Sequence, residues 1–188
     1  FRFADTAEEA QALYDGGEVD LVWPLADEAV AELAADETWT PTTALGTYTV
    51  LLNCSQDVFT DQLVRQALTL AIDREAVAQA AGVTARAAEG LVPPGVPGGE
   101  EGDFRGANAL LDNDPETYAG RCAQARQLLE EAGYDSGADP GELEYLYEDT
   151  PENAAVAQAL AAQWQQALRV KVTPVAMPAT ALRTALRS

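Results

Sequence analysis

Few side chains in this chain could carry out catalysis. The sequence contains no histidine, and Cys54 and Cys122 are its two cysteines. Without an imidazole, neither a Ser-His-Asp nor a Cys-His arrangement can be built, and zinc loses its commonest nitrogen ligand. Two thiolates are too few for a four-cysteine zinc site, and the sequence has no Walker loop and no Gly-x-Gly-x-x-Gly segment. We therefore predict a protein that is not an enzyme and that holds no metal or cofactor.

Carboxylates are the abundant ionisable groups of this chain. There are 31 acidic and 11 basic residues, which give a formal net charge of -20. Two carboxylates could serve as an acid and base pair, but no spacing singles out a pair, so we expect them to be solvated at the surface. The charge repels nucleic acid, and no nucleic-acid partner is predicted. Solubility or life in salt explains such a charge, with steering of cationic ligands as the alternative.

Asp73 and Arg65 are two charged residues of the predicted helical region that starts at residue 60. Asp73 lies between two predicted helices, where a carboxylate caps a helix or pairs with Arg65 or Arg74 more readily than it acts in catalysis. For Arg65 an ion pair within the structure is the expected role, and a position facing a cleft is the alternative.

The elements that would position these side chains alternate between strands and helices. Apolar residues at Val64, Leu68 and Ile72 follow a four-residue spacing, which is typical of one face of a helix. Trp164 shares such a spacing with neighbouring leucines, so we expect it in the core and not on a ligand-binding surface. The predicted elements are strands at 1–4, 19–23, 48–52, 143–147 and 170–172, helices at 6–14, 60–72, 115–133 and 151–168, and shorter helices after residues 27 and 73.

This alternation predicts the fold class. A strand, a helix and a second strand in succession form a right-handed crossover between parallel strands, as expected for 143–172. We therefore expect an α/β fold with a mixed, mostly parallel sheet flanked by helices. Residues 36–46 are polar and extended and are interpreted as a crossing between two lobes, while 90–106 are rich in proline and glycine and predict a surface loop or lid.

Several segments also carry a family resemblance, and they occur in the same order as in that family. The sequence is similar to the peptide- and nickel-type (family 5, cluster C) extracellular solute-binding proteins of bacterial ABC importers. The resemblance rests on Leu13–Leu21, Tyr48–Asn53, Val64–Leu68 with Ala71–Glu75, Gly90–Pro94 and Leu128–Tyr134.

The resemblance implies a fold like that of periplasmic binding proteins, in which two lobes close over a ligand. Members of this family are far longer than this chain. We therefore expect residues 1–45 to form the end of the first lobe and the hinge crossing. Residues 46–188 are expected to form the second, C-terminal-type α/β lobe, incomplete at its C-terminus.

The resemblance also implies a function. Such a protein captures an oligopeptide or dipeptide outside the membrane and delivers it to the permease and ATPase of an importer. A nickel chelate or another solute could bind to the same scaffold, and an acidic interaction domain without a ligand remains the alternative from another class. The implied location of the full-length protein is extracytoplasmic, as a membrane-anchored lipoprotein or a periplasmic protein.

Three residues are the best candidates to face a ligand cleft in such a lobe. Trp23 ends a predicted strand, Tyr48 stands beside the predicted hinge, and Asn53 stands at a corner between a strand and a helix. Each has a structural alternative: packing for Trp23, a core position for Tyr48 and helix capping for Asn53.

In an oxidising compartment Cys54 and Cys122 could also form a disulfide, which would stabilise the fold by about 4 kcal/mol. The sequence does not determine the distance between them, so the bridge and free thiols remain alternatives.

Overall fold

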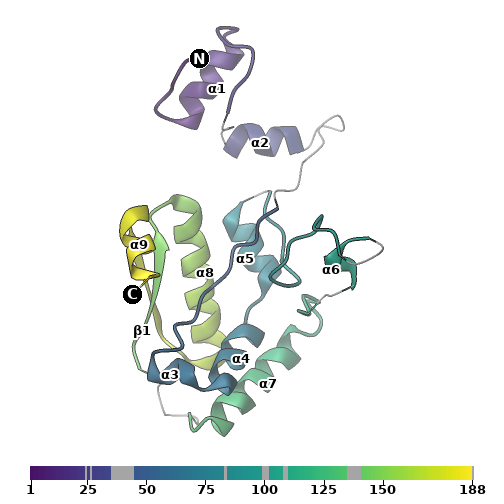
Figure 1. Cartoon of the computed structure of the whole chain (residues 1–188), viewed down its shortest axis with the longest axis vertical. Coiled ribbons are helices and arrows are strands. Elements are labelled where there is room, and N and C mark those ends of the chain that lie inside the picture. The colour runs from purple at the N-terminus through teal and green to yellow at the C-terminus, as the bar shows by residue number, and fades with distance from the viewer. Residues whose placement is uncertain are drawn as a thin grey trace. The chain divides into compact units, whose positions relative to one another are not determined.

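A computed structural model gives the structure of the chain, and its elements are shown in Figure 1. Contacts divide it into two units: Phe1–Thr42 with Gly82–Ala85, and Thr43–Ala81 with Arg86–Ser188. The residues that the structure describes are 1–23, 25, 27–34, 45–82, 84–98, 102–107, 110–134 and 141–187. Most of the crossing predicted at 36–46 lies outside them.

The first unit contains helices α1 (Ala7–Asp15) and α2 (Asp27–Ala34). As predicted, α1 begins at a capping box, because Thr6 Oγ1 accepts the N–H of Glu9 at 3.2 Å and the Glu9 carboxylate accepts the N–H of Asp5 at 3.0 Å. Gly17, at φ +70°, lies just past its end.

The strands predicted at 1–4 and 19–23 do not form. Both segments contain aromatic and β-branched residues, which favour an extended backbone, but a strand also needs a neighbour to pair with. Among the described residues of this unit there is none, and the side chains of Phe1, Phe3 and Trp23 are exposed. This part of the prediction was wrong.

The core of the second unit is formed mainly by α4 (Gln62–Leu70), α7 (Tyr118–Glu131) and α8 (Pro151–Leu168). Small side chains allow these helices to approach closely, since Ala67 and Ala125 are fully buried. The predicted apolar faces are confirmed. The buried core residues are Val64, Ala67, Leu68, Ala71, Cys122, Ala125, Leu129, Leu160, Trp164, Ala167, Leu168 and Val170.

The end of α4 is held by side chains from the other two helices. The last carbonyl groups of a helix have no donor within the helix and need another partner. Here Trp164 Nε1 donates to the carbonyl of Leu68 at 2.9 Å, and the hydroxyl of Tyr118 donates to the carbonyl of Ala71 at 3.2 Å. Trp164 is therefore a core residue, as predicted, and it also positions the chain where α4 ends.

Asp73 caps the next helix, α5 (Arg74–Ala81), as predicted. Its carboxylate accepts the N–H of Ala76 at 3.1 Å, and its main chain exchanges two hydrogen bonds with the side-chain amide of Gln163, at 2.9 and 3.2 Å.

The ion pair predicted for Arg65 is not found among the described residues. Its guanidinium instead donates to the carbonyls of Phe59 and Thr60, at 2.7 and 3.0 Å. These carbonyls end the short helix α3 (Asp57–Thr60) and lack donors of their own.

Helix α7 ends as predicted but begins later. Its end is marked by Gly133, at φ +91°, and the N–H of Tyr134 donates back to the carbonyl of Leu129 at 2.8 Å. Asp114, predicted as its cap, accepts the N–H of Glu116 at 2.8 Å and closes a turn before the helix. The helix therefore starts at Tyr118 and not at Pro115.

The described residues contain one sheet, in which β1 (Leu143–Glu148) and β2 (Val172–Met177) pair in parallel, from Leu143 opposite Val172 to Glu148 opposite Met177. Helix α8 connects them, which confirms the predicted crossover. Strand β2 begins two residues later than predicted, since Val170 packs into the core.

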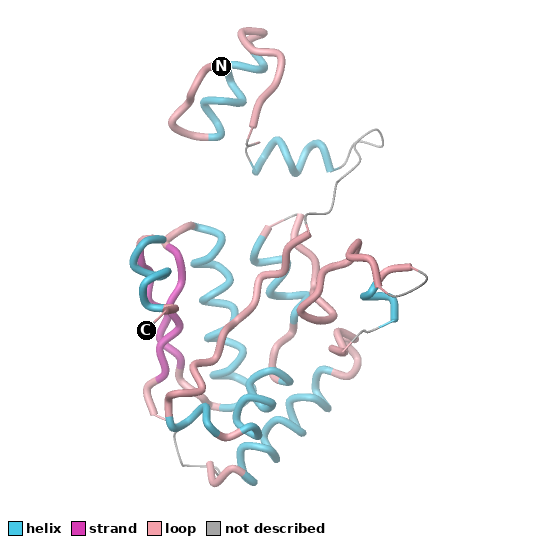
Figure 2. The backbone as a smooth tube through the Cα atoms, viewed as in Figure 1, coloured by secondary structure: helices cyan, strands magenta, loops and turns pink. Residues whose placement is uncertain are grey.

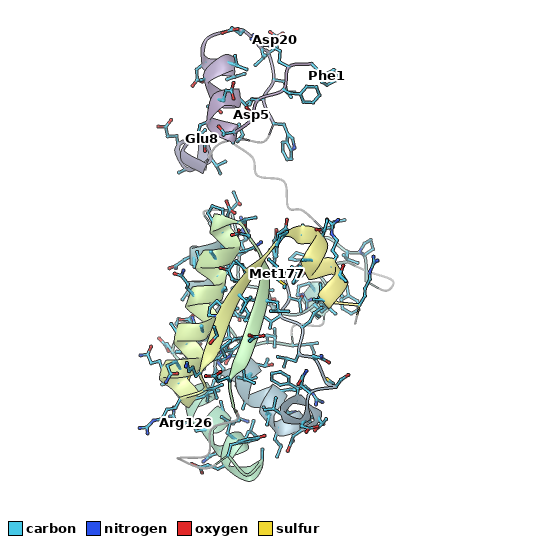
Figure 3. All side chains as sticks on the ribbon, turned by 90° about the vertical axis from the view of Figure 1, so that its left-hand side faces the viewer. Phe1, Asp5, Glu8, Asp20, Arg126 and Met177 are labelled. Carbon is cyan, nitrogen blue, oxygen red and sulfur yellow. The ribbon has the colours of Figure 1, made fainter. Side chains whose placement is uncertain are left out.

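A further helix, α9 (Ala179–Ala185), follows β2 and was not predicted. Figures 1 and 3 show α8 and α9 on opposite faces of the sheet. Residues 48–52 are extended but pair with no strand, so the strand predicted there does not form (Figure 2).

Candidate functional site

A groove of about 720 Å³ lies in the second unit. One wall is the extended segment Tyr48–Asn53, and the other is Glu142–Glu148, which includes β1. Leu182, Ala185 and Leu186 line it from α9 and the residue after that helix. We call this hollow the β1 groove.

The floor of the β1 groove belongs to the core. Phe59, Leu68 and Trp164 line it there. The indole N–H of Trp164 already donates to the carbonyl of Leu68, and 3% of this residue is exposed. Trp164 therefore offers a ligand neither a free donor nor an open ring face.

The polar groups that line the β1 groove are acidic or neutral. Glu142, Glu144 and Glu148 contribute carboxylates along the β1 wall, and none of the described lining residues is basic. Tyr145 and Tyr147 stack with ring centroids 6.4 Å apart and planes 20° apart, and burial raises the pKa of Tyr145. The groove therefore suits main-chain amides or cations better than anions.

Tyr48 and Asn53 line opposite ends of the segment that forms one wall. Tyr48 is 97% exposed, so the core position considered for it does not hold. Asn53 takes part in a turn, since its Oδ1 accepts the N–H of Ser55 and its carbonyl accepts the N–H of Gln56, both at 3.0 Å. Asn53 therefore closes a turn ahead of α3 and is not its cap, because the N-cap residue of that helix is Gln56.

Trp23 belongs to the first unit and is 86% exposed. The packing role considered for it is not seen among the described residues. The structure thus brings Tyr48 and Asn53 to one groove, and it leaves Trp23 as an open aromatic surface on the other unit.

The two cysteines are both free, with Cys54 exposed and Cys122 buried in the core. Cys54 Sγ donates to the carbonyl of Leu52 at 3.6 Å. Tyr118 lies beside Cys122, and burial, followed by the hydrogen bond with Cys122, raises the pKa of Tyr118 to about 12. The disulfide left open by the sequence is not formed in this structure.

The described residues contain no cluster of three acidic or cysteine side chains that could hold a metal ion. Nor does any helix in the described ranges reach the length and hydropathy of a membrane span.

Sequence reasoning missed the buried Arg105, which organises the loop predicted at 90–106. Arg105 is 6% exposed, and its Nε donates to the carbonyl of Val92 at 2.9 Å. Gly90 allows this approach, because a Cβ there would lie 2.3 Å from Arg105 Nη1. The clustering of glycines was the available signal, since glycine often marks close approach of a backbone to another group.

Asp103 holds the same loop from the surface. Its carboxylate accepts the N–H groups of Gly95 and Arg105, both at 2.8 Å. These hydrogen bonds lower the pKa of Asp103, because they stabilise the charged form. Hydrogen bonds of Asp103 and Arg105 thus hold the described parts of this loop, 90–98 and 102–106.

Comparison with known proteins identifies relatives of the whole chain. The family model described as "Bacterial extracellular solute-binding proteins, family 5 Middle" matches residues 1–187. The probable deoxycholate-binding periplasmic protein YgiS of Escherichia coli (strain K12) is 31% identical over 163 residues, which make up 85% of this chain and 29% of that protein.

Solved structures share the fold. The pheromone receptor PrgZ, solved to show its mode of peptide binding, is 24% identical with a TM-score of 0.74, over 97% of this chain and 36% of the receptor. The murein tripeptide binding protein MppA of Escherichia coli is 25% identical with a TM-score of 0.68, over 94% of this chain and 34% of MppA. The likeness confirms the α/β fold of the periplasmic-binding-protein type. The chain spans about a third of the length of these relatives.

Proposed function

The chain belongs to family 5 of the bacterial extracellular solute-binding proteins, and from this membership we propose that it is part of the substrate-binding component of an ABC importer. The full-length protein captures an oligopeptide or dipeptide outside the membrane and delivers it to the permease and the ATPase. The family match over residues 1–187 is the observation that carries this proposal. It confirms the resemblance indicated by the motifs, and it agrees with a binding protein rather than an enzyme.

The proposed division of the chain follows from the same premise. Residues 1–45 form the end of the first lobe and the hinge crossing, and 46–188 form the second lobe, which further chain completes. Ligand affinity then comes from contacts of both lobes as they close. The full-length protein is periplasmic or a membrane-anchored lipoprotein.

Trp23 and Tyr48 are the proposed ligand contacts. These residues are 86% and 97% exposed, and neither packs in the core that the described residues form. Exposed aromatic rings provide large contact areas at a small cost in side-chain entropy, and they tolerate varied peptide side chains. Asn53 is a weaker candidate, because its side-chain oxygen already closes a turn.

Peptide is favoured over other solutes by charge. The net charge of -20 disfavours anions, and no basic residue is found among the described residues that line the β1 groove. The relative named for deoxycholate binding nevertheless makes an amphipathic steroid carboxylate the second candidate ligand. Chelated nickel is the third, on the same scaffold.

A thermal-shift screen of the full-length protein tests this proposal. The screen uses peptides of two to five residues, deoxycholate and chelated nickel as separate sets. A peptide at about 100 times its Kd stabilises the folded protein by about 2.7 kcal/mol, which gives a measurable shift. A shift with deoxycholate or nickel alone would replace peptide as the ligand, and no shift with any set would count against solute binding.

Variants then test the two aromatic contacts. We expect Trp23→Ala and Tyr48→Ala each to weaken peptide binding by about tenfold, as for aromatic residues that contribute somewhat more than 1 kcal/mol at an interface. Phe3→Ala is the matched control, since Phe3 is an exposed aromatic residue to which we assign no ligand. Equal effects of all three variants would remove Trp23 and Tyr48 from the site.

A further inference from the structure

A second hollow of the second unit lies between α4 and α7, two helices that pack side by side (Figure 1). We call it the α4–α7 hollow. Its volume is about 520 Å³. Pockets of about 300–1,000 Å³ hold a drug-sized molecule, so this one has room for the tip of a loop. Its polar lining consists of Gln62, Arg65, Gln66, Thr69 and Gln124.

The α4–α7 hollow is separate from the β1 groove. No described residue lines both of them. Helix α4 contributes to each from a different side, since Leu68 lines the β1 groove, whereas Gln66 and Thr69 line the hollow. A molecule that binds in the hollow therefore leaves the β1 groove accessible.

The amide side chains of the hollow are not used by the fold. Gln62, Gln66 and Gln124 are exposed, and within the described part of the chain none of their side chains makes a hydrogen bond. Each amide offers two N–H donors and a carbonyl acceptor, which is the set of groups that pairs with another main chain. The hollow thus presents three unoccupied amides in one place.

The charges around the hollow are positive. Arg65 lines it, and Arg74 borders it, because Arg74 Nη2 donates to the carbonyl of Thr69 at 2.9 Å. None of the lining residues that the structure describes is acidic, although the chain has 31 acidic residues. Binding to carbonyls at helix ends explains where the two guanidinium groups lie, but neither forms an ion pair with a described carboxylate.

The pKa of Arg74 agrees with this lack of carboxylates. Burial lowers that pKa, and the positive charge of Arg121 lowers it further. A carboxylate beside Arg74 would act in the opposite sense. The arginines therefore keep their charge available to a partner that carries acidic groups.

From these observations we propose that the α4–α7 hollow binds an acidic loop of the permease to which the full-length protein delivers its ligand. The glutamine amides bond to the main chain of the loop, and Arg65 and Arg74 attract its carboxylates. The net charge of -20 disfavours such a loop elsewhere on the chain, which directs it to this hollow. The inference rests on the proposed function, because delivery requires a docking site that leaves the ligand site free.

Variants that change the charge of the hollow test the inference. The full-length protein, saturated with the peptide that gives the largest thermal shift, is titrated into the permease and ATPase of its importer in nanodiscs. The ATPase rate then gives the half-saturating concentration. We expect the double variant Gln66→Glu with Gln124→Glu to raise this concentration by about tenfold and Gln66→Arg to lower it, because the added charges have opposite signs. Both shifts should shrink in 1 M salt, where charges are screened beyond about 3 Å.

Gln165→Glu is the matched control, since Gln165 is exposed on α8 and lines neither the hollow nor the β1 groove. All variants should bind the peptide with the same Kd in calorimetry. A shift for Gln165→Glu as large as that of the double variant would overturn the inference, because net charge alone would then explain both.

Two further outcomes separate this inference from the proposed function. If the unaltered protein binds peptide and stimulates the ATPase, and the variants of Gln66 and Gln124 do so at the same concentration, the docking site is wrong and the proposed function stands. If the unaltered protein neither binds peptide nor stimulates the ATPase, both are wrong. Sedimentation that shows a dimer of the unaltered protein and a monomer of the double variant would assign the hollow to a second copy instead.

Discussion

The indole of Trp164 allows a quantitative test of how the core of the second unit is held. Its N–H donates to the carbonyl of Leu68 at 2.9 Å, and that carbonyl lies in the last turn of α4. In Trp164→Phe the buried carbonyl loses its donor, which costs about 1–3 kcal/mol. The smaller ring also leaves a gap that costs about 1 kcal/mol. We therefore expect the variant to lose about 2–4 kcal/mol, a large share of the 5–15 kcal/mol typical of a folded domain.

Urea unfolding followed by far-ultraviolet circular dichroism measures this loss without relying on the tryptophan signal. Trp23→Phe is the matched control, because Trp23 is exposed and its replacement should change the free energy of unfolding by less than about 0.5 kcal/mol. If Trp164→Phe also costs less than about 0.5 kcal/mol, the hydrogen bond to Leu68 does not stabilise the end of α4 and the reasoning is refuted.

Three other predictions concern particular residues of the second unit. Arg169→Gly should raise the free energy of unfolding by about 0.5–1 kcal/mol, because Arg169 ends α8 at φ +61°, where a side chain is strained; a lower urea midpoint would contradict this. The folded-state pKa of Asp103 is below its unfolded value of about 4, so its contribution to the loop is present above that pH and is lost as the pH falls through the folded pKa. Proteolysis of this loop should therefore become faster in acid, and Asp103→Asn should remove that dependence. Alkylation of the native protein should modify Cys54 and spare Cys122 until unfolding, whereas failure of both to react after unfolding without reductant would show a disulfide.

Segments with strong helical periodicity or clear end signals could be predicted from the sequence. The spacing of Leu160, Trp164 and Leu168 located α8, and the residues Thr150 and Pro151 located its start. The apolar spacing of a helix reflects a single buried face, and its start signals reflect contacts within the helix itself. Tertiary structure therefore did not need to be known.

Strands were predicted less well, because extended propensity does not supply a partner. Residues 48–52 have the composition of a strand and the burial pattern of one, yet no strand pairs with them among the described residues. The strands predicted at 1–4 and 19–23 do not form for the same reason. Pro174 made the extent of β2 hard to predict, because proline argues against a strand unless its position lies at a sheet edge.

The candidate site was predicted only in part. Tyr48 and Asn53 could be placed from their order relative to the strand and helix that follow, and both line the β1 groove. The groove wall from Glu142 to Glu148 could not be predicted. Which side of β1 is open depends on the register of the sheet and on the handedness of the connections. Arg105 was missed because burial of an arginine depends on the carbonyls that the folded loop presents to it.

Isothermal titration calorimetry of the full-length protein, with the peptide that gives the largest thermal shift, tests the proposed function most directly. The proposal predicts saturable binding of one peptide per protein, with a negative heat-capacity change from burial of apolar surface as the lobes close. Absence of saturable heat at peptide concentrations up to about 1 mM, where even weak specific binding gives about -4 kcal/mol, would contradict it.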